Sequence, residues 1–173
     1  MAKNEVKKMK IINVIRRLFH SYNYIDELDV SKLSDEELET IISEILYIEE
    51  IPSALNELYK RKPDIAFDLS KSIVEEERGD KFLQGATISV IFEYNNEYVI
   101  NFVKNSISNL NYYVYGSILD CIAVESKQPF GENLCREFLE MLANKYYEYT
   151  TSEKEKIAEE YNFFTKSYSI RMS

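Results

Sequence analysis

Histidine, tryptophan, glycine and proline are all scarce in this chain, and the single histidine excludes whole classes of catalytic site. A metal cage built from several histidines is impossible, and a Ser-His-Asp triad would have to use His20. His20 follows Phe19 in a segment rich in apolar residues, where a structural histidine is expected. Because Arg17 stands three positions before it, the Glu-x-x-His pattern of helical di-iron sites is missing too. We therefore expect no metal and no histidine-based catalysis.

The few glycines exclude the common nucleotide-binding motifs. They lie far apart, at Gly79, Gly85, Gly116 and Gly131, so the chain has no phosphate-binding loop, no G-x-G-x-x-G and no G-x-S-x-G. With only three prolines and scattered glycines, the sequence also contains no stretch that would form a flexible linker. With 173 residues, the chain is long enough to bury a core of its own. We predict a single domain over residues 1–173, with no cofactor and no small-molecule substrate.

The two cysteines and the lack of a long apolar run bear on the compartment. Cys121 and Cys135 stand fourteen residues apart, without a C-x-x-C pair and among apolar neighbours, so we expect buried free thiols. No stretch approaches the roughly 20 apolar residues of a membrane span. The first residues lack the apolar core of a signal peptide. These features predict a cytoplasmic protein with no membrane partner.

Negative charge is concentrated in one stretch of the sequence. From Asp26 to Glu57 there are eleven carboxylates against one base, Lys32, so this stretch has a net charge of -10 where the whole chain has -9. Folding does not require such segregation, whereas a concentrated negative field attracts a cationic partner. Glu39 and Glu44 lie in a charged context that would not raise the pKa of one carboxyl for acid catalysis. We therefore predict binding to a positively charged protein and no enzymatic activity.

A basic segment precedes this acidic stretch. Residues 3–24 place apolar side chains at near-helical spacing, which predicts an amphipathic helix. The interleaved bases are Lys3, Lys7, Lys8, Lys10, Arg16 and Arg17. With a sequence pI near 4.8, the acidic stretch would repel phosphates, so direct nucleic-acid binding is not expected. Two interpretations of the basic helix stay open: it packs near the acidic stretch and partly neutralises it, or both faces are solvated.

Helix start and stop signals recur along the rest of the chain. Ser34 and Glu37 form a capping-box pattern ahead of apolar residues at helical spacing. Pro52 opens a helix that runs to about residue 61. Pro63 turns the chain into another, which runs to about residue 77. These two adjacent helices form one predicted pair.

The helices that follow pair in the same manner. Asp80 begins a helix that Asn95-Asn96 interrupt, and a second one follows over residues 97–107. A third pair is predicted at residues 111–125 and 132–149, and a final helix starts near residue 152 with Glu155 at N3. Residues 65–73 match residues 99–107 at a constant offset of 34. Such a period is typical of α-solenoids, so we predict an all-α fold: a right-handed stack of antiparallel helix pairs (HEAT-like α-solenoid) with about eight or nine helices.

One stretch also fits a β-hairpin. Residues 87–92 and 98–103 are rich in β-branched and aromatic side chains, with Asn95-Asn96 between them as a candidate turn. The match at an offset of 34 ties this region to residues 65–77, whose lysines and glutamates favour helix. Helices are therefore preferred for residues 87–103, and the hairpin stays open as the alternative.

Tyrosine is abundant, with fourteen copies and two close groups at residues 112–115 and 146–149. Aromatic side chains surrounded by carboxylates are typical of tight protein interfaces, where the rings slow dissociation and the charges speed encounter. The alternative interpretation is that the tyrosines cover the edges of the core. Both interpretations remain open for each tyrosine.

An acidic, tyrosine-rich chain of paired helices without a catalytic motif resembles one class of bacterial proteins. Residues 51–149 are similar to the all-helical, HEAT-like immunity proteins of contact-dependent growth inhibition and polymorphic toxin systems. The units that carry the resemblance include Ala54-Leu55-Asn56-Glu57-Leu58-Tyr59-Lys60-Arg61-Lys62-Pro63-Asp64-Ile65-Ala66 and Ile91-Phe92-Glu93-Tyr94-Asn95-Asn96-Glu97-Tyr98-Val99-Ile100. The repeats contain fewer alanines than typical HEAT units.

The resemblance implies an inhibitor that binds a cognate protein toxin in the cytoplasm and covers its active site or substrate groove. Many such toxins are nucleases with a basic cleft, for which an acidic partner would compete. The residues expected to contact the toxin are Asp26, Glu27, Asp29, Glu36, Glu39, Glu44, Tyr47, Tyr94, Tyr113 and Tyr115. The main alternative is a helical-repeat adaptor that binds another cellular protein without inhibiting it.

Overall fold

The computed structural model of the protein describes residues 29–169, and every regular element in that range is a helix. This confirms the predicted all-α class. The β-hairpin alternative for residues 87–103 is excluded, because α6 (Ile88–Tyr94) and α7 (Asn96–Ser106) occupy that stretch. The predicted basic helix at residues 3–24, with His20, lies outside the described residues.

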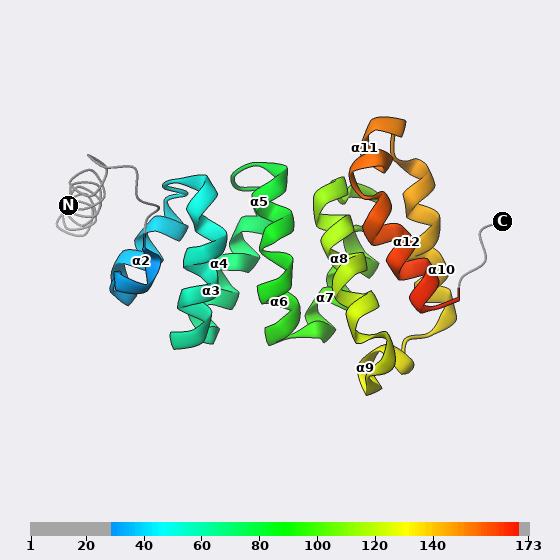
Figure 1. The fold of residues 1–173 in the computed structure, drawn as a ribbon, viewed down its shortest axis with the longest axis horizontal. Helices are drawn as coiled ribbons and strands as arrows, with labels where there is room; N and C mark the ends of the chain where they lie inside the picture. The colour runs from blue at the N-terminus through cyan, green and yellow to red at the C-terminus, as the bar shows by residue number, and fades with distance from the viewer. Residues whose placement is uncertain (1–28, 170–173) are drawn as a thin grey trace. The chain divides into compact units, whose positions relative to one another are not determined.

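The helices, which Figure 1 labels, belong to two compact units that meet in the sequence at Gly79. In the described range, the N-terminal unit contains η1 (Val30–Lys32), α2 (Asp35–Ser43), η2 (Ile48–Glu50), α3 (Ile51–Arg61) and α4 (Pro63–Glu75). The C-terminal unit contains α5 (Lys81–Ala86), α6, α7, η3 (Ile107–Asn109), α8 (Tyr112–Val124), η4 (Glu125–Lys127), α9 (Pro129–Glu132), α10 (Arg136–Lys145), η5 (Tyr146–Glu148), α11 (Thr151–Lys156) and α12 (Ala158–Ser167). The single domain and the right-handed stacking of helix pairs remain predictions.

The N-terminal unit is built from α2, α3 and α4, which contact one another. The predicted capping box of α2 is confirmed: the Glu37 amide donates to the Ser34 hydroxyl at 3.3 Å, and the Ser34 amide donates to the Glu37 carboxylate at 2.9 Å. One face of α3 is buried, with apolar residues at helical spacing. These residues are Ile51, Ala54, Leu55 and Leu58. The core of this unit therefore lies between the three helices.

A sharp turn follows α2 and leads to η2. The Leu46 amide donates to the Ile41 carbonyl at 2.9 Å and the Ile45 amide to the Ile42 carbonyl at 3.3 Å, which are the two bonds of a Schellman motif. Glycine usually occupies the left-handed position of this motif, but here Ile45 does, with a φ of 51°. Tyr47 is also left-handed, with a φ of 55°. The chain thereby reverses within a few residues and places the acidic η2 directly before α3.

The helix α8 is central to the C-terminal unit and contacts α5, α6 and α12. It is buried on several sides, through Tyr112, Val114, Tyr115, Gly116, Ile118, Leu119, Ile122 and Ala123. Two glycines allow neighbouring segments to approach it closely. A Cβ at Gly85 would lie 2.9 Å from the Tyr113 carbonyl carbon, and one at Gly116 would lie 3.0 Å from Cγ2 of Ile157. Larger residues at these positions would push the neighbouring helices apart.

Several helix boundaries differ from the prediction, and the helix expected over residues 132–149 is the shorter α10, which is followed by η5. The helix expected to start at Asp80 is two helices, α5 and α6, which meet at Thr87. The final helix begins earlier than expected, because Thr150 caps α11 in a capping box with Glu153, so Glu155 is not at N3. That helix is also divided, since α11 ends at Lys156 and α12 starts at Ala158. Three consecutive residues that can cap a helix, 150–152, made the register ambiguous in the sequence.

The prediction that both cysteines are buried is wrong. Cys135 is exposed because it is the N-cap residue of α10, and Cys121 is only half-buried on α8. Burial of the Cys121 thiol, followed by repulsion from Asp120, raises the pKa of that thiol to about 12. Cys121 is therefore a protonated, weakly reactive thiol near neutral pH.

The sequence match at an offset of 34 falls on α4 and α7. Each of these helices packs against the helix before it, α3 and α6 respectively. Each also has a local start signal: Pro63 opens α4, and the Asn95 side chain accepts from the Tyr98 amide at 2.9 Å at the start of α7. The matched residues therefore occupy equivalent second helices of two helix pairs.

Candidate functional site

An acidic groove in the N-terminal unit is the strongest candidate site. It has a volume of about 760 Å³ and lies between η1, η2 and α3. Its lining residues are Asp29, Val30, Ser31, Glu49, Glu50, Ser53, Asn56, Glu57 and Lys60. Four carboxylates therefore face a single lysine, and most of the remaining lining is polar. We call this feature the acidic groove.

Local capping forms one wall of the acidic groove. The Asp29 carboxylate accepts from the Ser31 amide at 3.2 Å, which caps η1. The same carboxylate forms an ion pair with Lys32 at 2.9 Å. The Lys32 side chain is 80% exposed. The pKa of Asp29 is lowered, first by its hydrogen bond with Ser31 and then by Lys32, so this carboxylate carries its charge at neutral pH.

The opposite wall comes from η2 and the start of α3. Glu49 and Glu50 are adjacent residues in η2, placed there by the left-handed turn at Tyr47. Within residues 29–169, neither Glu49 nor Glu50 forms an ion pair with a lysine or arginine. Glu57 lies two turns along α3 and pairs with Lys60 at 3.3 Å. The acidic groove thus contains two carboxylates whose charge no described base neutralises.

Arg61 does not line the acidic groove, but it contacts the residues that form the wall of the groove. Its guanidinium donates to the Glu57 carboxylate at 2.7 Å and contacts Asp35 at 3.3 Å. It also donates to the carbonyls of Leu33 at 2.7 Å and Ser31 at 2.8 Å. Arg61 therefore joins the C-terminal end of α3 to η1 and the start of α2. Its planar group with several donors suits such a set of acceptors better than a lysine would.

Carboxylates next to these bases have lowered pKa values. The pKa of Glu57 is lowered first by its hydrogen bond with Arg61 and then by that with Lys60. For Asp35, desolvation would raise the pKa, but the hydrogen bonds with Arg61 and Lys62 together outweigh it and lower the pKa. Lys62 contacts Asp35 at 3.3 Å and Glu39 at 3.5 Å. Part of the acidic stretch is therefore engaged in internal ion pairs.

The acidic residues predicted from the sequence fall in three places. Asp26 and Glu27 lie outside the described residues. Asp29 lines the acidic groove. Three others, Glu36, Glu39 and Glu44, belong to α2 and its C-cap and do not line the groove. Tyr47 is in the turn before η2.

The three predicted tyrosines belong to the C-terminal unit, and one of them is unsuited to binding. Tyr94 ends α6 with 39% exposure, and Tyr113 lies on α8, where its ring contacts Phe82 edge-on at 5.7 Å. Tyr115 is fully buried, and its hydroxyl donates to the Leu142 carbonyl at 2.8 Å. A buried ring cannot contact a partner, so we correct the expectation for Tyr115: it is a core residue. Its pKa is raised, first by burial.

Sequence reasoning missed Glu49, Glu50, Arg61 and Lys62 as important residues. The two glutamates were counted in the acidic stretch but not distinguished from the other acids. Arg61 and Lys62 follow within five residues of Glu57, where the stretch ends. The spacing of Glu57 and Arg61, four residues apart on a helix, was the available signal for an internal ion pair.

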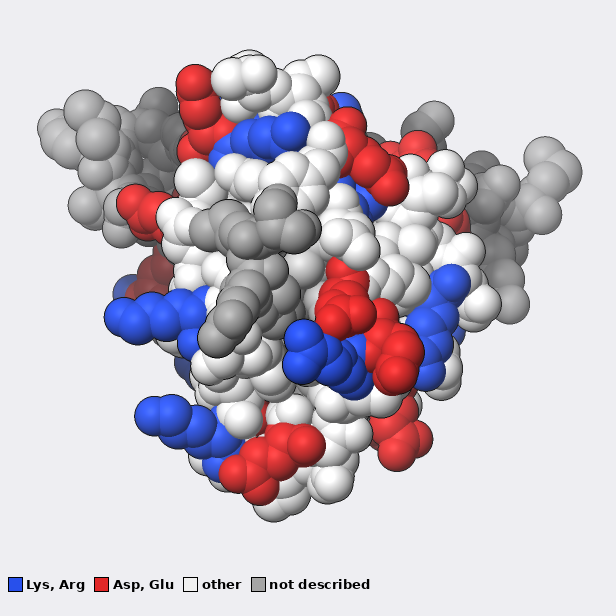
Figure 2. All heavy atoms as spheres, turned by 90° about the vertical axis from the view of Figure 1, so that its right-hand side faces the viewer, with Lys and Arg blue, Asp and Glu red and all other residues white. Residues whose placement is uncertain are grey.

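Charge is distributed differently in the rest of the molecule. Basic and acidic side chains are interspersed on the face shown in Figure 2, without a region of one sign. From residue 80 to 169 there are thirteen acidic residues against eight basic ones, whereas residues 29–79 contain fourteen against six. Within residues 29–169, the part that belongs to the N-terminal unit is therefore the shorter and the more strongly charged of the two.

Comparison with known proteins gives no assignment: no family model, no curated protein and no solved structure matches this chain. Across residues 29–169, no helix combines the length and apolar character needed to cross a bilayer. In the same range, no group of histidine, cysteine and acidic side chains is arranged to hold a metal ion. The geometry and charge of the acidic groove are therefore the main indication of function.

Proposed function

We propose that this chain is a cytoplasmic immunity protein that binds a basic, nuclease-type bacterial toxin and covers its active site or substrate groove. The observation that carries the proposal is the acidic groove, which is lined by the carboxylates Asp29, Glu49, Glu50 and Glu57 and by a single base, Lys60. A nuclease must present cationic side chains to its nucleic-acid substrate, and these match the charge of the groove.

The state of the individual carboxylates supports binding rather than catalysis. The lowered pKa values of Asp29 and Glu57 keep both groups charged, which suits attraction of a cation and not proton donation. The Lys32 that pairs with Asp29 is largely exposed, so this ion pair costs little to exchange for one with a partner. Glu49 and Glu50 form no ion pair with a described base, so a cation of the partner can bind them without displacing one.

A growth assay tests the proposal. The product of the reading frame next to this gene is expressed alone and together with the chain, and we expect growth arrest in the first case and rescue in the second. The double variant Glu49→Lys with Glu50→Lys should lose rescue. The matched control, Asp68→Lys with Glu76→Lys, changes the net charge by the same amount at exposed positions that do not line the groove and should retain it.

Two results would contradict the proposal. Equal rescue by both double variants would show that the acidic groove is not the binding site. A neighbouring product that binds the chain but does not arrest growth would favour the alternative, a helical-repeat adaptor that binds without inhibiting.

A further inference from the structure

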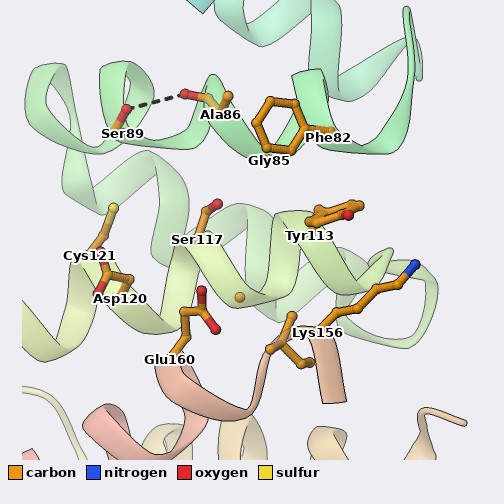
Figure 3. A pocket seen from close by; sticks show the side chains of 12 residues that line it. Phe82, Gly85, Ala86, Ser89, Tyr113, Ser117, Asp120, Cys121, Lys156 and Glu160 are labelled. Atoms are coloured by element: carbon orange, nitrogen blue, oxygen red, sulfur yellow. Dashed lines mark hydrogen bonds between the residues drawn. The ribbon is translucent and has the colours of Figure 1, made fainter. Parts of the chain in front are cut away.

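A second hollow lies within the C-terminal unit, between α5, α8 and the junction of α11 and α12 (Figure 3). Its volume is about 280 Å³. Small residues leave this space open, among them Gly85 and Ala86 on α5 and Ser117 on α8. The α5 backbone approaches α8 closely at Gly85, while the hollow opens beside that contact. This site is separate from the acidic groove in its residues and in its unit.

The hollow contains a carboxylate oxygen that lacks a partner. Oε2 of Glu160 is buried and accepts no hydrogen bond from the residues that the structure describes. In Figure 3 the Glu160 carboxylate extends from α12 into the hollow that Ser117 and Asp120 also line. A buried acceptor without a donor is unfavourable, and native proteins usually satisfy it with water, an ion or a ligand. The unpaired carboxylate oxygen of Glu160 favours a cationic donor, and the exposed Asp120 carboxylate lines the same hollow.

The lysine at the edge of the hollow is engaged elsewhere. Lys156 donates to the Tyr112 hydroxyl at 3.1 Å, and its ammonium lies 5.1 Å from the centre of the Tyr112 ring. The hydrogen bond with Tyr112 is the main reason that the pKa of Lys156 is raised. No ion pair joins Lys156 to Glu160 or Asp120 in the described range. The negative charge at this end of the hollow is therefore not neutralised from within.

Aromatic rings form the outer rim of the hollow. Phe82 is 60% exposed and packs edge-on against Tyr113, with ring centres 5.7 Å apart. Exposed aromatic faces attract ammonium and guanidinium groups. We propose that this hollow binds a cationic nitrogen group on a short apolar stem, with the nitrogen at Glu160 and Asp120 and the stem against Phe82 and Tyr113.

The size of the hollow sets the size of the ligand. Ligand pockets commonly have volumes of about 300–1,000 Å³, so this hollow accepts one group the size of a side chain and not a nucleotide cofactor. Two kinds of ligand contain such a cationic group on an apolar stem. One is a free alkylamine or alkylguanidine, and the other is a lysine or arginine side chain of a protein. The inference does not depend on the partner of the acidic groove.

NMR titration of the full chain tests the inference. The probes are butylammonium and butylguanidinium, with butanol and butyrate as neutral and anionic controls of similar shape. A capped Ala-Arg-Ala peptide represents an arginine side chain of a protein partner. We expect saturable shifts of the Gly85, Ser117 and Glu160 amides with the cationic probes only. Glu160→Gln should weaken binding about tenfold or more, as expected for losing a hydrogen bond to a charged group.

Glu159→Gln is the matched control, because Glu159 is the exposed neighbour of Glu160 on α12 and does not line the hollow. It should leave affinity within about twofold, as surface substitutions usually do. Ser117→Leu, which fills the hollow, should abolish the shifts. If the free cations bind, a small amine or guanidine is sufficient as the ligand. If only the peptide binds, the ligand is a side chain of a protein. Equal binding of butanol, equal effects of the two glutamine variants, or no saturable shift with any cation would overturn the proposal.

Discussion

The two units of this protein use different residues to hold their helices together. In the N-terminal unit, Arg61 and Lys62 form ion pairs and backbone hydrogen bonds across its surface. In the C-terminal unit, tyrosine hydroxyls donate to backbone carbonyls of distant segments: Tyr115 to Leu142 at 2.8 Å, Tyr149 to Leu110 at 2.7 Å and Tyr168 to Ile122 at 3.0 Å. Ten of the fourteen tyrosines lie between residues 80 and 169.

This difference separates residues that serve stability from residues available for binding. Exposed ion pairs stabilise a fold only slightly, so the surplus of acids in the N-terminal unit has little structural purpose. A buried tyrosine contributes both apolar area and a satisfied hydrogen bond. Most of the tyrosines therefore cover the core and its edges, as one of the two interpretations of the sequence proposed. The acidic residues remain the candidates for binding.

The largest effect is expected from Tyr115→Ala. Removing this ring leaves a cavity and an unpaired Leu142 carbonyl, and comparable aromatic deletions destabilise proteins by about 3–5 kcal/mol. Tyr115→Phe removes only the hydroxyl and should cost about 1–3 kcal/mol. Chemical denaturation gives the free energy of unfolding, and hydrogen exchange shows which unit loses protection. We expect the loss to be confined to the C-terminal unit.

Phe163→Ala provides the control for the tyrosine deletion. Phe163 is on α12 but 43% exposed, so its removal should cost less than about 1 kcal/mol. Equal loss of protection in both units after Tyr115→Ala would show that the two units unfold as one, as the predicted single domain would.

The response to pH should differ between the units. Burial is the main reason that the pKa values of Tyr115 and Tyr149 are raised above the ordinary value of 10.0. Folding therefore favours the protonated phenols, and this stability is present below about pH 10 and lost as the pH rises toward the folded pKa values. The C-terminal unit should unfold first in alkali. Near-ultraviolet tyrosinate absorbance, measured with amide NMR signals, reports the transition.

In acid the order should reverse. The pKa of Glu57, lowered chiefly by the Arg61 hydrogen bond, lies below its ordinary value of 4.5. The stability from this pairing is complete above about pH 4.5 and is lost as the pH falls through the folded pKa. Amide signals of η1 and the start of α2 should weaken before those of α8. Simultaneous loss of both sets in acid would argue against a local contribution of the Glu57–Arg61 pair to the N-terminal unit.

Arg61→Met should destabilise a smaller part of the N-terminal unit than Tyr115→Ala destabilises in the C-terminal unit. It removes the bonds to two carbonyls and to Glu57, while keeping the aliphatic stem. We expect faster hydrogen exchange at residues 30–38 and little change in the C-terminal unit. Lys60→Met is the control, since Lys60 is 71% exposed and makes one ion pair. If the two variants behave alike, the contacts of Arg61 with the backbone are unimportant.

The two capping boxes allow the smallest matched comparison. Ser34→Ala in the N-terminal unit and Thr150→Ala in the C-terminal unit each remove one capping hydroxyl. Each should cost about 0.5–2 kcal/mol of unfolding free energy, with the loss of amide protection restricted to α2 or α11. Protection lost outside the substituted unit would show that the two units unfold together.

Local signals in the sequence predicted much of the fold. The capping box at Ser34, the helix opening at Pro63 and the interruption at Asn95 depend on residues only a few positions apart, and each is present in the structure. Features that depend on distant contacts were missed. Arg61 binds the carbonyl of Ser31, thirty residues away, and Tyr115 is buried because helices from both sides of the sequence cover α8.

The same limit applies to the candidate site. The concentration of acids was visible in the sequence, but its division into ion-paired and unpaired carboxylates depends on the turn at Ile45 and Tyr47. These two residues adopt left-handed conformations that their side chains disfavour, so no sequence signal marks them. The hollow beside Glu160 is likewise formed by α5, α8 and α12, which are far apart in the chain.

The most direct measurement is the salt-dependent affinity of the chain for a labelled octalysine peptide, followed by fluorescence anisotropy. We predict that Glu49→Lys with Glu50→Lys weakens binding about tenfold or more at low salt, and that added salt reduces this difference. The control pair Asp68→Lys with Glu76→Lys should bind nearly as the unaltered chain does. Equal weakening by the two pairs would show that net charge alone attracts the peptide, and would contradict a binding site in the acidic groove.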